Sequence, residues 1–157
     1  MMTLYHGSNM RIEEIDLNRC KPFKDFGKGF YLTDILEQAQ QMAERRTRIV
    51  GEGVPTVTAY SFDSNWLQSS ELKVKCFDAP NEEWAKFVLA NRRQKNFVHA
   101  FDIVVGPVAD DGIALQLDRY EHHFISLEVL VKELTYRHLN KQYFFGTDLA
   151  VSKLTLL

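Results

Sequence analysis

The order of strand-like and helix-like patterns constrains the fold of this chain more than any other feature of its sequence. Alternating β-branched and aromatic residues mark strands, and apolar residues three or four positions apart mark helices. Strands are expected at residues 3–6, 30–33, 56–62, 72–77, 101–105 and 141–145. Helices are expected from residue 34 and at residues 81–93, 110–120, 126–134 and 148–154, followed by a strand-like Leu-Thr-Leu-Leu tail. Because this order has no regular strand–helix–strand rhythm, it predicts an α+β fold.

Length and composition favour one domain over residues 1–157, since 45% of the residues are hydrophobic and 12% aromatic. The net charge of -2 gives no sign of the basic face that non-specific phosphate binding needs. Cys20 and Cys76 lie far apart in no metal-like spacing, so we expect two reduced thiols. No apolar run approaches the roughly 18 residues of a membrane span. We therefore expect a cytoplasmic protein that does not enter the membrane.

A long polar segment separates the first two expected strands. Residues 11–29 contain Pro22 and several charged breaks, and we expect a loop that is functional or mobile. Thr33 is the expected N-cap of the following helix, because its hydroxyl can accept a hydrogen bond from an otherwise unpaired backbone N–H. The face shared by the apolar positions of this helix consists of Ile35, Ala39, Met42, Ala43 and Arg46.

The first motif is Leu4–Ser8, which places a histidine and a glycine at the end of a strand. Gly7 has no side chain, so the backbone can approach a flat ligand while the imidazole of His6 donates a hydrogen bond to it. A strand-terminal histidine followed by a turn glycine gives the same pattern without any ligand. The motif alone leaves both interpretations open.

The second motif is Gly27–Thr33, in which two glycines precede an aromatic strand and an immediate helix. Tyr31 offers a flat face on which a nicotinamide ring can stack, and the glycines permit close packing of loop and strand. Phe30 alternates with Tyr31 and is expected to point into the core. The alternative is a glycine-rich turn with a core tyrosine.

Together with Gln142–Thr147, these segments resemble the three motif strands of the ADP-ribosyltransferase fold. In that fold a His, a Tyr and usually a Glu form the NAD pocket, and the triplet here is His6, Tyr31 and Gln142. The resemblance implies a split antiparallel β-sheet with flanking helices and NAD as co-substrate. It also implies that His6 binds a ribose hydroxyl and that the backbone of Gly7 holds the carboxamide. The implied catalytic residues are His6, Tyr31 and Gln142, the implied NAD-binding residues are His6, Gly7, Ser8, Asp25, Gly29 and Tyr31, and no metal site is expected.

Four segments resemble a narrower group of small bacterial proteins of this fold, often encoded beside a small partner in toxin–antitoxin-like pairs. They are Leu4–Ser8, Lys24–Tyr31, Asp102–Asp111 and the strand that contains Gln142. This resemblance implies a mono-ADP-ribosyltransferase of the glycosyltransferase class, with an unidentified macromolecular acceptor and a small antitoxin-like protein partner. Two alternatives remain open: a catalytically silent binder of NAD or ADP-ribose, and an interaction module that kept only the fold.

Gln142 is where the sequence departs from the usual glutamate. In relatives with Glu, the carboxylate binds the ribose 2′-hydroxyl and stabilises the positive charge that develops as nicotinamide leaves. An amide keeps the hydrogen bond and loses a charge worth roughly 1 to 4 kcal/mol at about 4 Å. The missing charge could come from the acceptor, from Asp148 or from Asp25. Asp25 could otherwise pair with Lys24 or Arg11 or remain a solvated loop charge.

Three other features are interpreted as structural. The side chains of adjacent His122 and His123 diverge, which argues against a metal site there. Asp110 and Asp111 are expected at a helix N-terminus, where the macrodipole favours negative charge. Arg45, Arg46 and Arg48 form a basic cluster that could contact pyrophosphate, although a solvated helix face is the favoured interpretation.

Overall fold

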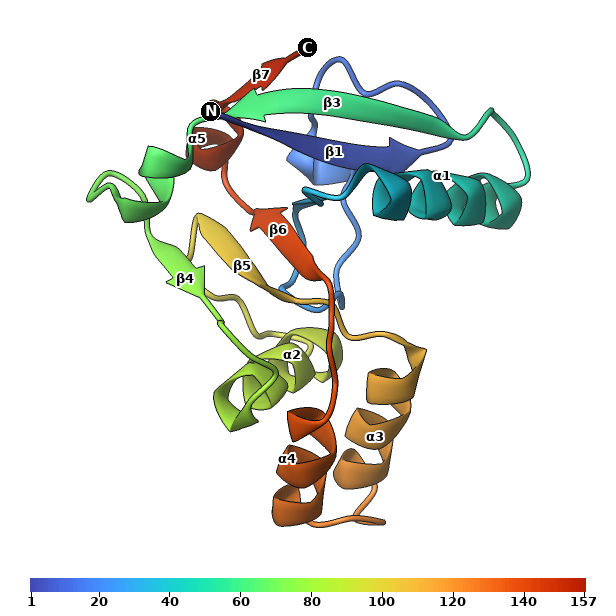
Figure 1. Ribbon diagram of the computed structural model, residues 1–157, viewed down its shortest axis with the longest axis vertical. Helices are drawn as coiled ribbons and strands as arrows, with labels where there is room; N and C mark the ends of the chain where they lie inside the picture. The colour runs from blue at the N-terminus through green and yellow to red at the C-terminus, as the bar shows by residue number, and fades with distance from the viewer.

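The computed structural model describes residues 1–157 and contains two β-sheets and five α-helices, which confirms the α+β class. One sheet has the strand order β1-β3-β7, formed by Met2–Ser8, Thr56–Phe62 and Leu154–Leu156. The other has the order β2-β6-β5-β4, formed by Phe30–Leu32, Lys141–Phe145, Ile103–Pro107 and Val74–Cys76. Figure 1 shows the three-stranded sheet with helix α1 at one end of the molecule and helices α2, α3 and α4 at the other end.

The strand pairing departs at one place from the expected antiparallel sheet. β4 pairs parallel with β5, whereas every other pair of strands is antiparallel. Helix α2, Glu82–Arg93, lies between β4 and β5 in the chain, and a crossover of this length returns the chain in the same direction. The expectation of a wholly antiparallel sheet was wrong for this pair.

The backbones of the two sheets are joined by a single β-bridge. Tyr5 of β1 and Thr33, directly after β2, form an isolated antiparallel bridge with N···O distances of 2.7 and 2.9 Å. Beyond this bridge β1 and β2 form no further backbone ladder, because β1 continues along β3 while β2 continues along β6. The sheet is therefore split between the strands that carry the first two motifs.

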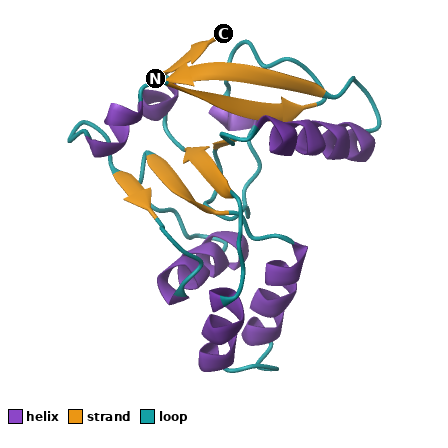
Figure 2. Ribbon diagram, viewed as in Figure 1, coloured by secondary structure: helices purple, strands orange, loops and turns teal.

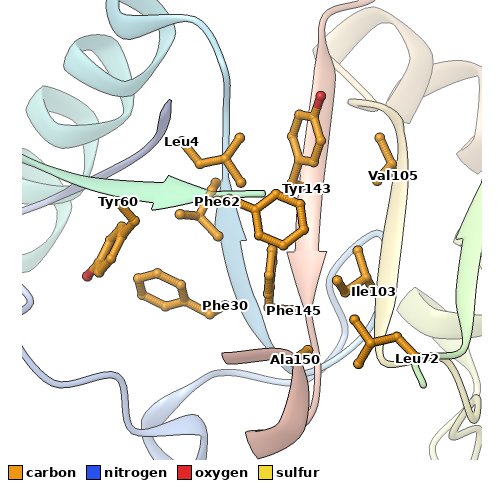
Figure 3. Close-up of a cluster of buried hydrophobic side chains, with 11 residues drawn as sticks. Leu4, Phe30, Tyr60, Phe62, Leu72, Ile103, Val105, Tyr143, Phe145 and Ala150 are labelled. Atoms are coloured by element: carbon orange, nitrogen blue, oxygen red, sulfur yellow. The ribbon is translucent and has the colours of Figure 1, made fainter. Parts of the chain in front are cut away.

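Two hydrophobic cores lie on opposite faces of the four-stranded sheet. Figure 3 shows the core between the two sheets, where Phe30, Tyr143 and Phe145 pack with Leu4 and Phe62. The second core lies between the other face and the helices, and contains Phe26, Trp84, Val104, Ile113, Leu130 and Phe144. Because side chains alternate along a strand, β6 contributes to both cores. The expectation that Phe30 points into the core is confirmed.

Helix α1, Leu36–Val50, begins later than expected. Its N-cap is Ile35, without a side-chain cap, so the assignment of the cap to Thr33 was wrong. The Thr33 hydroxyl accepts instead from the N–H of Ile35, 3.1 Å away, in a turn before the helix. Only the small residues Ala39 and Ala43 of the expected apolar face are buried; Ile35 and Met42 are exposed, because the helix backbone lies directly against β1.

The other helices, drawn in purple in Figure 2, begin within one residue of their expected positions. Asn81 caps α2, and Asp110 and Ser126 cap α3, Asp111–Glu121, and α4, Leu127–Thr135. The last helix, α5, is shorter than expected at Asp148–Val151, because the chain turns into β7. None of these helices combines the length and apolar character that crossing a membrane requires.

Two strands extend through glycines that were expected to end them. β1 continues through Gly7 and Ser8, which pair with Val57 and Thr56. β5 begins later than expected, at Ile103, and continues through Gly106 and Pro107, which pair with Gln142 and Lys141. Neighbouring strands override the local turn signals of glycine and proline here.

Candidate functional site

A cleft of about 1380 Å³ opens at the split between β1 and β2. The residues expected from the sequence to bind NAD or to act in catalysis all line it: His6, Gly7, Ser8, Asp25, Gly29, Tyr31 and Gln142. They come from β1, from the loop before β2, from β2 and from β6. The cleft is the place where the three motifs meet.

His6 is held in one orientation. Its Nδ1 lies 2.6 Å from the carbonyl oxygen of Tyr31, and its ring stacks on Phe30 with centroids 4.1 Å apart. A carbonyl oxygen only accepts, so Nδ1 carries the proton. Burial lowers the pKa of His6, although the hydrogen bond to Tyr31 acts in the opposite direction. The lowered pKa favours the neutral imidazole. Nε2 is therefore an acceptor, and the expected donor role of the ring changes to an acceptor role.

Gly7 is required for a reason other than the expected one. A Cβ here would overlap the carbonyl oxygen of Ala39 and lie 2.7 Å from the backbone N of Ala43, so the glycine admits helix α1. Its backbone faces the split, however. Tyr5 bonds to Thr33 and thus points its N–H and C=O away from β3, and two residues further on Gly7 points the same way. Gly7 therefore offers one donor and one acceptor to the cleft.

Tyr31 is locked through its hydroxyl. The hydroxyl donates to the carbonyl oxygen of Gly27 at 2.6 Å and accepts from the N–H of Phe26 at 2.9 Å. Burial raises the pKa of Tyr31 well above its usual value, which excludes ionisation near neutral pH. The ring meets Phe144 edge-on at 5.3 Å between centroids. Tyr31 thus provides an aromatic surface in the cleft, not a proton.

The glycines of the second motif shape the loop around Tyr31. Gly27 has a φ of 96°, a conformation that favours glycine, and its carbonyl receives the Tyr31 hydroxyl. A Cβ on Gly29 would overlap the ring of Phe144 and lie 2.8 Å from the carbonyl oxygen of Phe145. Close packing of loop and strand is what these glycines permit, as expected.

Ser8 of the first motif is buried, and its hydroxyl donates a hydrogen bond to the side-chain oxygen of Asn9 at 3.2 Å.

Asp25 is not a solvated loop charge, and it does not pair with Lys24 or Arg11 as the sequence had suggested. It is 7% exposed. Its Oδ1 accepts from Nε of Arg92 at 2.7 Å and also contacts Nη2. Its Oδ2 accepts from the N–H of Ala109 and from Nε2 of Gln142, both at 3.0 Å. Asp25 joins the loop to α2, β6 and the end of β5.

Gln142 lies on the face of the sheet that carries Tyr31. Tyr31 pairs with Phe144, and Gln142 lies two residues before Phe144, on the same face of β6. Its Nε2 donates to Asp25 and lies 3.5 Å from the carbonyl oxygen of Pro107. Because both neighbours are acceptors, the amide nitrogen must face them. Asp148, the other acid considered as a source of charge, also lines the cleft.

Three residues that support this site escaped the sequence interpretation. Arg92 holds Asp25, while Asn91 would meet a Cβ on Gly27 at 3.0 Å. His99 donates from Nε2 to the carbonyl oxygen of Phe26 at 2.6 Å and accepts from Phe101. Burial lowers the pKa of His99, which favours the neutral imidazole. No local pattern distinguishes Arg92 and His99, because their partners Asp25 and Phe26 lie 67 and 73 residues away in the chain.

The rim of the cleft is rich in cations. Burial lowers the pKa of Lys24, and the nearby charges of Arg46 and Lys21 lower it further. Arg45 and Arg46 line the cleft from exposed positions on α1, whereas Arg48 does not. A cluster of positive charges beside His6 favours an anionic ligand. Phe23, half exposed with a φ of 63°, lies in the same rim.

The acidic pair Asp110 and Asp111 and the adjacent His122 and His123, both interpreted as structural, lie apart from this cleft. Asp110 caps α3 by accepting from the N–H of Ile113 at 2.9 Å. His122 contacts the backbone of Asp118 one turn earlier, and His123 follows the helix. No group of three His, Cys, Asp or Glu side chains with metal-ligand geometry occurs in the structure. Cys20 and Cys76 are unpaired thiols.

Comparison with known proteins identifies the family of the chain. Residues 2–156 match the model of the family described as Protein of unknown function (DUF3990), so the chain belongs to this family. No curated protein and no solved structure matches the chain.

Proposed function

We propose that this protein transfers ADP-ribose from NAD to a macromolecule. The observation that carries the proposal is the meeting of His6, Tyr31 and Gln142 in one cleft, although they lie on three strands far apart in the chain. The cations at the rim, Lys24 and Arg46, favour the pyrophosphate of this substrate. Each motif residue presents a group that suits one part of NAD.

The side chains suggest a division of roles. Nε2 of His6 accepts a hydrogen bond from a ribose hydroxyl, and the backbone N–H and C=O of Gly7 suit the nicotinamide carboxamide. The Tyr31 ring packs against nicotinamide, and the amide oxygen of Gln142 accepts from the ribose 2′-hydroxyl. Clamping both halves of the glycosidic bond holds the substrate close to its reacting geometry.

The reaction breaks the bond between C1′ of the ribose and the ring nitrogen of nicotinamide. The electron pair of this bond goes to that nitrogen, and neutral nicotinamide leaves. A nucleophilic atom of the acceptor forms the new bond to C1′ and releases its proton to solvent. Tyr31 does not take this proton, since its hydroxyl is committed to Phe26 and Gly27.

One observation favours a second candidate, a catalytically silent binder of NAD or ADP-ribose. Gln142 is neutral, and the charge of Asp25 is balanced by Arg92. Little net negative charge therefore faces the ribose, which weakens electrostatic stabilisation of the developing positive charge. A silent binder would retain the contacts of His6, Gly7 and Tyr31 without turnover.

We further propose that the protein acts in the cytoplasm as a toxin held in check by a small protein partner. The support is the resemblance of Leu4–Ser8, Lys24–Tyr31 and Asp102–Asp111 to proteins of such pairs. An acceptor bound outside the NAD cleft would leave no trace in the motif residues. The acceptor is therefore defined only as a macromolecule.

The test is release of nicotinamide from NAD by the purified protein, with and without bacterial cell extract, alongside calorimetric titration of NAD. Transfer predicts release that rises with extract, and label from adenine-labelled NAD in a macromolecular fraction. Binding without release under both conditions favours the silent binder. Absence of NAD binding would refute both candidates. Glu82→Gln, which breaks an exposed ion pair with Lys86 on α2, is the matched control.

A further inference from the structure

Asp25 is surrounded by hydrogen-bond donors only. Arg92 contributes Nε and Nη2, Ala109 contributes its backbone N–H, and Gln142 contributes its side-chain amide. An ionised carboxylate accepts all four, because it has two oxygens and about four lone-pair sites. No contact is left over for a proton on the carboxyl group. Asp25 therefore serves as a fixed anionic acceptor in the wall of the cleft.

This acceptor determines which way the Gln142 amide points. Nε2 faces Asp25 Oδ2 at 3.0 Å and the carbonyl oxygen of Pro107 at 3.5 Å. The reverse orientation would place Oε1 against two other oxygens and remove one donor from each, although Asp25 Oδ2 would keep the N–H of Ala109 and the Pro107 carbonyl would keep Nε1 of Trp84. Only one orientation of the amide satisfies its neighbours.

The other end of the amide is free. Gln142 Oε1 makes no hydrogen bond within the protein, and the buried side-chain polar atom that lacks a partner is Oε1 of Gln38 instead. Gln142 Oε1 is therefore reached by solvent although the residue is only 9% exposed. The space that it faces is the cleft, whose wall includes Gln142.

We infer that Asp25, held in place by Arg92, is a positioning residue that turns the Gln142 amide oxygen towards the ribose. The catalytic part of this inference rests on the proposed function; the orientation of the amide does not. The positioning role of Asp25 also explains why residue 142 is a glutamine and not a glutamate. A glutamate at residue 142 would place a second carboxylate against Asp25 Oδ2 and the Pro107 carbonyl, where an N–H donor now lies.

If Asp25, Arg92 and Gln142 had a purely structural role, different results would be expected. Asp25, Arg92 and Gln142 would then tie the loop to α2 and β6, and removing one contact would lower stability without changing how Gln142 acts. Asp25→Asn separates the two roles, because it conserves shape. Its Oδ1 can still accept from Arg92, but its amide nitrogen would face the Gln142 Nε2 and force that amide to turn.

The orientation is measured by hydrogen exchange of the Gln142 side-chain amide in two-dimensional nitrogen–proton spectra. We expect slow exchange in the wild type, clearly faster exchange in Asp25→Asn and an intermediate rate in Arg92→Lys, which keeps the charge but loses the forked contact. Glu82→Gln, on the same helix as Arg92, should match the wild type. Rapid exchange in the wild type, or equal rates in wild type and Asp25→Asn, would overturn the positioning role.

The consequence for turnover is measured by a double-mutant cycle on nicotinamide release. Asp25→Asn should lower kcat about three- to tenfold, the worth of one orienting hydrogen bond. In a Gln142→Ala background the same change should lower kcat by less than about twofold, because the residue through which Asp25 acts is gone. Additive losses would overturn the inference. A wild type that neither binds NAD nor releases nicotinamide would refute the proposed function alone, since hydrogen exchange still decides the orientation.

Discussion

The Nδ1 atom of His6 lies 2.6 Å from the carbonyl oxygen of Tyr31, and this hydrogen bond joins the two sheets across their split. Close to the Tyr5–Thr33 bridge, it ties a side chain of β1 to the backbone of β2. The orientation of one motif residue is thus set by the backbone of the next.

The first prediction concerns pH. Burial holds the pKa values of His6 and His99 below 6.5, the ordinary value that the unfolded chain regains. As pH falls below about 6.5, the unfolded state therefore binds more protons than the folded state. The free energy of unfolding should be at its full value above that pH and decline as pH falls towards the folded pKa values. His6→Gln and His99→Gln should each flatten this decline in urea unfolding between pH 5 and 7.5.

The control for the pH experiment is His138→Gln, which removes an exposed imidazole. If neither His6→Gln nor His99→Gln changed the slope relative to this control, the neutral state assigned to the two buried rings would be wrong.

A second prediction concerns the Tyr31 hydroxyl. Tyr31→Phe keeps the ring but leaves the N–H of Phe26 and the carbonyl of Gly27 without their partner. We expect a loss of about 1 to 3 kcal/mol in unfolding free energy and weaker NAD binding through a looser loop. Tyr31→Ala should abolish NAD binding, because it removes the aromatic surface. Calorimetric titration with equal affinity for a folded Tyr31→Ala protein would refute the placement of nicotinamide.

A third prediction concerns Gly7. Gly7→Ala would drive a Cβ into the backbone of α1, which cannot yield as a flexible side chain would. We expect destabilisation of about 1 to 3 kcal/mol or more in urea unfolding. Gly112→Ala is the matched control, since its Cβ would meet only the end of the Arg137 side chain, at 3.0 Å, on a helix that favours alanine. Similar stabilities for the two variants would contradict the close contact between α1 and β1.

The fourth prediction follows from the toxin proposal. Expression of the chain alone should slow the growth of a bacterial host, and His6→Ala should relieve the effect at equal protein level. The variant removes the ribose-facing Nε2 and the bond to Tyr31. Growth curves with immunoblots of both proteins provide the measurement. A harmless wild type would argue against a toxin while leaving ADP-ribosyl transfer open.

The sequence predicted the elements of the fold better than the contacts between them. The α+β class, β6 at Lys141–Phe145 and the positions of α2, α3 and α4 follow from local patterns. The environment of Asp25 does not, because Arg92 and Ala109 lie 67 and 84 residues away in the chain. The burial of α1 was misjudged for a related reason: its packing depends on Gly7, which lies in another element.

The alternation of β6 restricts how this protein can evolve. Tyr143 and Phe145 fill one core while Gln142 and Phe144 face the other side of the sheet. Insertion or deletion of one codon within β6 would exchange the two faces and bury the amide between the sheets. Insertions and deletions should therefore be tolerated before Lys141 or after Gly146. Within β6 they should be rejected, because the site depends on the alternation of this strand.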